Sequence, residues 1–344
     1  DILPKINILA ERTDPRRVRY WLPSGGTEDE ANLRFRRYAI EEGTALIHNL
    51  GKVVAGDARP GEAKRYAAIV GVPIAVEAEE PDGIEDVFSS IWKAADGFDK
   101  PVLVLPWLNF MGDPRWDALK LQGLHAKAQL MGQQIFEIVG AYRSGAELRT
   151  EVAVGIDQMP QGTPSIGKIR QAMAIAALGY NRSYDTPFMM CDYDSTLGPD
   201  AIQIASDTLK HDRALFVNGK IHYTSELLNK TPDEVALLDL DSKLIYLTES
   251  LRRTMLDHLP PEAFRGYVPE PGLAIKHGLL MTLGGFNTKV SNSESYWLQV
   301  AAIKALRQWY DVSSYRVKGR WPEPNIQPPP DPYVPNHVAE RITS

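Results

Sequence analysis

Thr186-Pro-Phe-Met-Met-Cys-Asp-Tyr-Asp-Ser-Thr-Leu-Gly-Pro-Asp200 is the most informative segment of this sequence. Its apolar run, Phe188–Cys191, predicts a buried strand. The strand ends in two acids that are one residue apart, Asp192 and Asp194. A glycine and a proline then turn the chain, and Ala201–Leu209 begins a predicted helix. The order of strand, acidic turn and helix indicates an α/β protein.

The first two-thirds of the chain repeat this alternation. Short runs rich in Val, Ile and Leu predict strands at Lys5–Ala10, Thr44–Asn49, Val72–Val76, Val102–Leu105 and Glu151–Ile156. Apolar residues at helical spacing predict helices at Glu28–Glu42, Gly61–Val70, Ile84–Ala95, Trp116–Tyr142 and Ile166–Leu178. Continuously apolar strands separated by helices favour a mostly parallel central sheet flanked by helices. In such sheets ligands bind beyond the carboxyl ends of the strands.

The second half of the chain has a different character. It is expected to contain a polar connection with a short helix, a strand or helix with charged flanks, and an amphipathic helix, at Lys220–Asp239, Leu240–His258 and Ser293–Trp309. From Trp321 onward, seven prolines disfavour helix and central strand. We therefore expect three parts: an N-terminal α/β region (1–100) that extends or joins the sheet, a main domain (101–315), and an extended Pro-rich tail (316–344).

Composition excludes some functions. The chain has 344 residues and a net charge of −6, which gives no general attraction to nucleic acid or anionic lipid. Its single cysteine, Cys191, excludes an intramolecular disulfide and a multi-cysteine metal site. The first residues do not form a signal peptide, and no apolar stretch is long enough to span a bilayer. We expect a cytoplasmic protein, with a homo-oligomer as one option.

The acidic pair itself points to a cation. Carboxylates as close as Asp192 and Asp194 repel each other unless a cation, a substrate proton or strong donors offset their charge. A hard divalent ion that is bound through oxygen and bridges substrate phosphates is the usual answer. The alternative is that both acids cap the following turn and helix in solvent.

Asp192-Tyr-Asp194, followed by Leu197 and Pro199-Asp200-Ala201, resembles the Asp-x-Asp element of glycosyltransferases with the GT-A fold, especially the family 2 type. The resemblance implies a GT-A type nucleotide-diphospho-sugar transferase fold. It also implies metal-dependent transfer of a sugar from a UDP- or GDP-linked donor to an acceptor that the sequence does not identify. Asp194 would bind Mn²⁺ or Mg²⁺, and Asp192 would bind the ribose or the water shell of the metal.

Flanking segments extend the resemblance. Val102–Asn109 resembles the first strand of that fold, Glu151–Asp157 resembles the second, and Gly167–Arg170 resembles its donor-binding turn. Positive charge beside a helix N-terminus would suit a diphosphate. The donor-binding residues implied are Pro106, Asn109, Asp157, Lys168, Arg170 and Asp192.

The placement of the first strands is open. Arg19–Pro23 and Thr44–Val76 could supply them instead, with Trp116–Tyr142 as an insertion.

Downstream, Gly284-Gly285-Phe286 followed by Ser293-Glu294-Ser295 resembles the Gly-Gly-Phe and Glu-Asp region of the same family. The resemblance places Gly284, Gly285, Phe286 and Glu294 on the acceptor side. Ser295 stands where the family has its second acid, the base of inverting enzymes. Either Glu294 takes over that catalytic role, or the enzyme retains configuration. His277 and His337 are candidates for a third metal ligand, although packed or surface histidines are more common.

Two other functions fit parts of the sequence. Asp192-Tyr-Asp194-Ser-Thr-Leu197 also resembles the first motif of haloacid dehalogenase-like phosphatases, with Asp192 as the nucleophile and Asp194 as the general acid. That reading needs a later acid pair, for which Asp239 and Asp241 are the candidates. A non-catalytic sugar-nucleotide or glycan-binding protein would explain the missing acid at Ser295. A (β/α)₈ barrel is disfavoured by the irregular second half.

Overall fold

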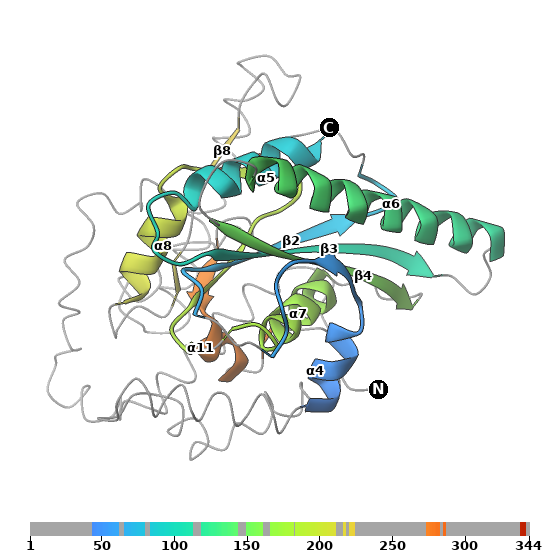
Figure 1. The fold of residues 1–344 in the computed structure, drawn as a ribbon, viewed down its shortest axis with the longest axis horizontal. Helices are drawn as coiled ribbons and strands as arrows, with labels where there is room; N and C mark the ends of the chain where they lie inside the picture. The colour runs from blue at the N-terminus through green and yellow to red at the C-terminus, as the bar shows by residue number, and fades with distance from the viewer. Residues whose placement is uncertain are drawn as a thin grey trace, which may run out of the picture.

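The computed structural model describes residues 43–61, 65–79, 83–112, 118–143, 149–160, 166–181, 183–210, 216–217, 220–223, 273–282, 285–286 and 338–341. Within these ranges lies a seven-stranded sheet with the order β1-β4-β3-β2-β5-β9-β7 (Figure 1). Its strands are β1 (Val53–Gly56), β2 (Ile69–Ala75), β3 (Val102–Gly112), β4 (Thr150–Pro160), β5 (Pro187–Met190), β7 (Phe216–Val217) and β9 (Ala274–Lys276). A second sheet joins β6 (Ser195–Leu197), β10 (Val338–Arg341) and β8 (Lys220–Tyr223), with β10 in the middle.

The main sheet is mixed, which corrects the expectation of a mostly parallel one. The four strands β4, β3, β2 and β5 are parallel to one another. On one side of them β1 pairs antiparallel with β4, and on the other side β9 pairs antiparallel with β5 and β7. The parallel strands β2, β3, β4 and β5 are linked in turn by crossover helices at Ile84–Ala94, Ala118–Arg143 and Ile166–Ala177.

Helices cover both faces of the sheet (Figure 1). One face carries α4 (Gly43–Leu50), α7 (Ile166–Ala177) and α11 (His277–Thr282), and the other carries α5 (Ile84–Ala94), α6 (Ala118–Arg143) and α8 (Ala201–Leu209). Side chains of β3 contribute to the cores on both faces of the sheet, because successive side chains of a strand point to opposite faces. Leu103, Leu105 and Trp107 belong to the α7-side core, whereas Val102, Val104 and Leu108 belong to the α5-side core.

Most predicted elements in the described part of the chain are confirmed. The strands Val72–Val76, Glu151–Ile156 and Phe188–Cys191 correspond to β2, β4 and β5, and the predicted helix Ala201–Leu209 is α8. The helices predicted at Ile84–Ala95, Trp116–Tyr142 and Ile166–Leu178 are α5, α6 and α7 with nearly the same bounds. Lys5–Ala10, Glu28–Glu42, Leu240–His258 and Ser293–Trp309 lie outside the described residues, as does most of Lys220–Asp239.

Three predictions for the described residues are wrong. The tail from Trp321 onward was expected to contain no central strand, but β10, which begins after the last proline, lies between β6 and β8. Thr44–Asn49 was expected to be a strand, but it lies within α4. Gly61–Val70 was expected to be a helix, but its end forms the start of β2. The amide of Ala67 donates to the carbonyl of Pro101, and the carbonyl of Ala68 accepts from the amide of Leu103. Backbone groups that bond to a neighbouring strand are not available for helical bonds.

Strand β3 is longer than the predicted Val102–Leu105 and continues through Pro106 to Gly112. The pairing of β3 with β4 matches Val104 to Val152 and then Trp107 to Gly155, so it steps over Pro106. Proline has no backbone N–H to donate to the ladder. The neighbouring pairs on both sides hold the strand together across this gap.

None of the helices in the described part of the chain is long and apolar enough to cross a membrane.

Candidate functional site

The segment after β5 forms a turn, in which the Ser195 amide donates to the Asp192 carbonyl at 3.0 Å, and buried and partly exposed residues alternate along it. Cys191, Tyr193, Ser195 and Leu197 are buried, whereas Asp192, Asp194 and Thr196 between them are partly exposed. Tyr193 and Leu197 belong to the core on the α5 side. Both acids therefore keep partial access to solvent, while the residues beside them in sequence are buried. The buried residues anchor the turn that carries both acids.

Further contacts fix this turn to its surroundings. The Leu197 amide donates to Ser90 Oγ of α5 at 3.0 Å, and Ser90 Oγ donates to the Val87 carbonyl at 2.7 Å. The Cys191 thiol lies 3.5 Å from the Ser195 carbonyl. Burial, reinforced by Asp192 and Asp194, raises the pKa of that thiol, so the cysteine stays protonated. Cys191 therefore has a structural role.

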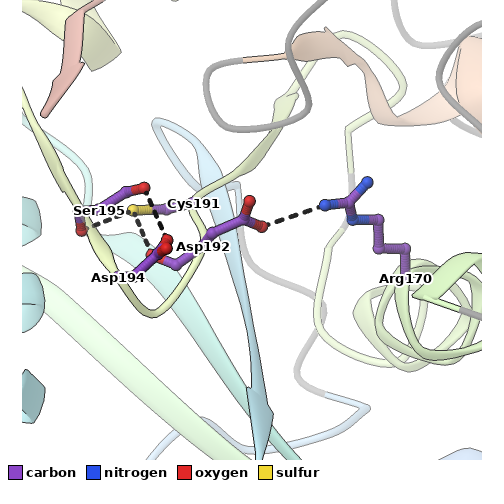
Figure 2. Close-up of polar contacts among 5 residues, drawn as sticks. All are labelled: Arg170, Cys191, Asp192, Asp194 and Ser195. Atoms are coloured by element: carbon purple, nitrogen blue, oxygen red, sulfur yellow. Dashed lines mark hydrogen bonds and ion pairs between the residues drawn. The ribbon is translucent and has the colours of Figure 1, made fainter. Parts of the chain in front are cut away.

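The two acids have different partners (Figure 2). Asp192 Oδ1 accepts a hydrogen bond from Nη2 of Arg170 at 3.1 Å. The Arg170 side chain is 2% exposed and the Asp192 side chain is 27% exposed. Asp194 Oδ1 accepts from Ser195 Oγ at 3.2 Å. A buried guanidinium thus balances Asp192, whereas Asp194 contacts a neutral hydroxyl.

Glu79, a third acid, shares this edge of the sheet, and we did not anticipate it from the sequence. It follows β2, and its amide donates to the Ala75 carbonyl in a turn at the strand's carboxyl end. Burial and the charges of Asp194 and Asp192 raise the pKa of Glu79, while Lys127 opposes them. Lys127 of α6 also donates to the Glu79 carbonyl at 3.1 Å. The signal for Glu79 was its place just after the predicted strand Val72–Val76.

Of the predicted donor residues of β3 and β4, Asn109 and Asp157 lie close to the carboxyl ends of their strands, whereas Pro106 lies near the middle of β3. Asn109 and Asp157 are register partners on β3 and β4. The amide group of Asn109 donates to the Ile74 carbonyl at 2.7 Å, so it ties β3 to β2. Asp157 Oδ2 accepts from Lys52 Nζ at 2.7 Å. Pro106 is buried three residues before Asn109.

Helix α7 links the acidic turn to the Gly-Gly-Phe segment. Arg170 pairs with Asp192, and the next residue, Gln171, accepts a hydrogen bond from the Phe286 amide at 2.7 Å. Gly285 has φ 77°, a left-handed conformation that favours glycine, and a Cβ there would collide with Gln171. The Phe286 ring lies 6.3 Å from that of Phe188 in β5. Two segments that are far apart in sequence therefore pack on the same helix and strand.

Lys168 lies in the first turn of α7 and is partly buried. Because α7 follows β4, this turn lies at the carboxyl edge of the parallel strands. The sequence prediction grouped Lys168 with Arg170 as diphosphate ligands, but the structure gives the two cations different surroundings. Arg170 is turned to Asp192 and buried, whereas Lys168 retains access to solvent.

His277 has the environment of a structural residue. It is 0% exposed and stacks on Phe188 at 5.6 Å. Its Nε2 lies 2.8 Å from the Ala174 carbonyl, and its Nδ1 lies 3.0 Å from Nδ2 of Asn181. Nε2 therefore donates and Nδ1 accepts, as in a neutral imidazole. With both ring nitrogens occupied, we do not retain His277 as a metal ligand.

Several predicted site residues lie outside the described residues: Gly284, Glu294 and His337, and the acids of the phosphatase alternative, Asp239 and Asp241. Two aromatic residues, Trp107 in β3 and Tyr193 after β5, are 0% and 5% exposed and belong to the core.

The donor set at this edge suits a hard cation that a substrate helps to hold. Within the described ranges, no three His, Cys, Asp or Glu side chains form a ready metal site. Mg²⁺ is usually bound by one or two carboxylates, water and substrate phosphates rather than by a complete protein cage. Asp192 and Asp194, partly exposed and carrying only oxygen ligands, fit that arrangement.

Comparison with known proteins gives distant structural likeness and no match in sequence. No protein-family model matches the chain, and no curated protein matches it in sequence. Among solved structures it is similar to a mannosyltransferase from Pyrobaculum calidifontis in complex with GDP-Man and Mn²⁺. The identity is 16% and the TM-score 0.40, over 90% of this chain and 69% of the other. A likeness this distant fixes neither the fold family nor the activity of this chain.

Proposed function

We propose that this chain is a metal-dependent glycosyltransferase that moves a sugar from a UDP- or GDP-linked donor to an acceptor. One observation carries the proposal: two partly exposed acids, Asp192 and Asp194, directly follow β5 at the carboxyl edge of the parallel strands. Ligands of open α/β sheets bind at that edge. The pairing of Arg170 with Asp192 and the contact between α7 and Phe286 support a single site there.

Each residue has a proposed task. Asp194 holds Mn²⁺ or Mg²⁺, and Asp192, kept in place by Arg170, binds the ribose or the water shell of the metal. The bound ion would neutralise the negative charge that develops on the leaving diphosphate. Lys168 adds positive charge beside the N-terminus of α7. Asp157 contacts the nucleotide, and the segment from Gly284 to Glu294 faces the acceptor.

Metal and donor should bind as a coupled pair. Two carboxylates, one of which already bonds to an arginine, give a divalent ion only part of its coordination shell. Donor phosphates would supply the rest, so the ion should bind weakly alone and more tightly with the donor. By thermodynamic linkage, the metal ion should increase the affinity for the donor by the same factor as the donor increases the affinity for the ion. A resident metal site would behave differently and would bind without nucleotide.

The first test is a thermal-shift screen of UDP- and GDP-sugars with and without Mn²⁺ or Mg²⁺. A bound donor raises the melting temperature by mass action. We expect a rise only when donor and metal are both present, together with slow release of nucleoside diphosphate. A rise without release would favour the non-catalytic binder. Hydrolysis of a generic aryl phosphate that is lost in Asp192→Asn would favour the phosphatase.

The second test removes the metal ligand. Asp194→Ala should abolish turnover and the metal-dependent shift while leaving the fold intact. Asp99→Ala is the matched control, because Asp99 is an exposed acid on the turn before β3, at the opposite edge of the sheet. It should leave both measurements unchanged. Turnover at the wild-type rate in Asp194→Ala would refute the assignment.

A further inference from the structure

Lys52, in the described segment before β2, contacts Asp157 of the candidate site. Strand β1 pairs antiparallel with β4, and the Ile156 amide donates to the Lys52 carbonyl at 2.9 Å. This backbone bond brings Lys52 beside Asp157, the next residue of β4. Lys52 Nζ then lies 2.7 Å from Asp157 Oδ2.

The position of Lys52 is fixed on both sides. After β1, the Asp57 carboxylate accepts from the Val152 amide at 2.8 Å, and the Asp57 amide donates to the Val152 carbonyl at 3.0 Å. Before β1, helix α4 places Leu46 and Leu50 against the core on the α7 side. The segment is therefore attached to β4 and to the core. These contacts keep the backbone of Lys52 close to Asp157.

This ion pair differs from an ordinary surface pair. Its side chains are 21% and 11% exposed, and they are 105 residues apart in sequence. Asp207 in α8 and Lys210 just after it form an ion pair of the same 2.7 Å length. The Lys210 and Asp207 side chains are 69% and 54% exposed, and the two residues are three apart in sequence. Exposed pairs of that kind contribute little to stability. The two pairs are a matched comparison of a sheltered and an exposed contact.

We propose that Lys52 is a positioning residue for donor binding: it holds the Asp157 carboxylate so that its remaining acceptor capacity faces the nucleotide. This inference rests on the proposed function, in which Asp157 contacts the donor. A carboxylate that accepts one hydrogen bond from lysine can still accept others. Asp157 needs to be held because it lies at the carboxyl edge of the sheet, where β4 is close to its end. The segment that carries Lys52 thereby becomes part of the donor site.

The experiment compares Lys52→Met, Lys52→Arg and the control Lys210→Met. Methionine keeps much of the length of lysine and removes the charge. In Lys52→Met the donor Kd and KM should rise about tenfold, the scale of one lost charged hydrogen bond, with kcat unchanged because only donor binding is weakened. Lys52→Arg, which keeps a cation beside Asp157, should recover most of the affinity. Lys210→Met should bind the donor as the wild type does.

A double-mutant cycle with Asp157→Asn identifies the route of the effect. If Lys52 acts through Asp157, then Lys52→Met should change the donor Kd little once Asp157→Asn is present. All Kd values are measured well below each variant's melting temperature, so that unfolding does not imitate weak binding. A full tenfold loss in the Asp157→Asn background would overturn the proposal.

The remaining outcomes separate this proposal from the function on which it rests. If the wild type binds no nucleotide sugar with metal, the proposed function fails and this inference fails with it. If the wild type binds a donor and Lys52→Met binds it equally well, the function stands and only the positioning role is refuted. A lower melting temperature with unchanged donor Kd would show that the ion pair serves the fold alone.

Discussion

Mild acid should weaken this fold through one buried histidine, His277. Burial lowers the pKa of His277 from 6.5 to about 4, and its bond to the Ala174 carbonyl offsets part of that effect. The unfolded chain takes up the proton near pH 6.5, whereas the folded chain resists until about pH 4. The stabilisation is therefore complete above pH 6.5 and is lost as the pH falls toward 4. At about 1.4 kcal/mol per pH unit, the total is about 3 kcal/mol.

The measurement is the free energy of unfolding by urea at several pH values between 7.5 and 4, for the wild type and His277→Gln. Glutamine keeps a donor for the Ala174 carbonyl but does not titrate. The variant should be less stable at pH 7.5, because it loses the ring stacked on Phe188 and the acceptor for Asn181. Carboxylates titrate in both proteins, so the difference between the two curves isolates the histidine. That difference should shrink by about 3 kcal/mol on acidification. A difference that does not change with pH would refute the buried, neutral state.

Two further predictions concern α7 and its neighbours. Gly285→Ala should reduce the free energy of unfolding by at least about 1 kcal/mol more than Gly97→Ala. Gly285 and Gly97 have positive φ, 77° and 83°, but an added Cβ would meet Gln171 at Gly285 and nothing within 4 Å at Gly97. Equal losses of unfolding free energy in the two variants would contradict the packing of Gly285 on Gln171. Arg170→Met should cost about 2 kcal/mol in urea unfolding and weaken donor binding. The substitution leaves Asp192 without the buried positive charge of Arg170. Because Asp192 is partly exposed, the loss of stability should be smaller than for a fully buried ion pair. Unchanged stability would contradict a stabilising ion pair.

The elements of the central sheet were predictable because their sequences are unambiguous. Val102–Leu105 and Phe188–Cys191 are continuous apolar runs, Glu151–Ile156 is apolar after its first residue, and each follows a clear helical pattern or a break. Thr44–Asn49 failed because an apolar run of that length fits either structure. Leu46 and Leu50 are one helical turn apart and both pack on the core, whereas Ile47 is 71% exposed. Periodicity alone does not reveal that choice.

The acidic turn was predictable from the sequence, but the other residues that lie near it were not. Asp192 and Asp194 are recognisable in the sequence as two acids directly after a predicted strand. Glu79 joins them because β2 pairs with β5, with Gly71 opposite Met190, although more than a hundred residues separate the two strands. Strand order depends on how the crossovers pack in three dimensions, and periodicity along the chain does not record it. The same reason hid the contact of Lys52 with Asp157.

Helix α7 has a consequence for how donor specificity could change. Ten of its twelve residues are buried, and the exceptions, Ile166 and Lys168, lie in its first turn. Interior packing is dense, so a helix enclosed in this way cannot shift without disturbing the layers around it. If the chain binds a nucleotide-sugar donor as proposed, α7 forms a rigid side of that site. Divergence toward another sugar would then proceed more easily through substitutions at Ile166 and Lys168 than within the buried part of the helix.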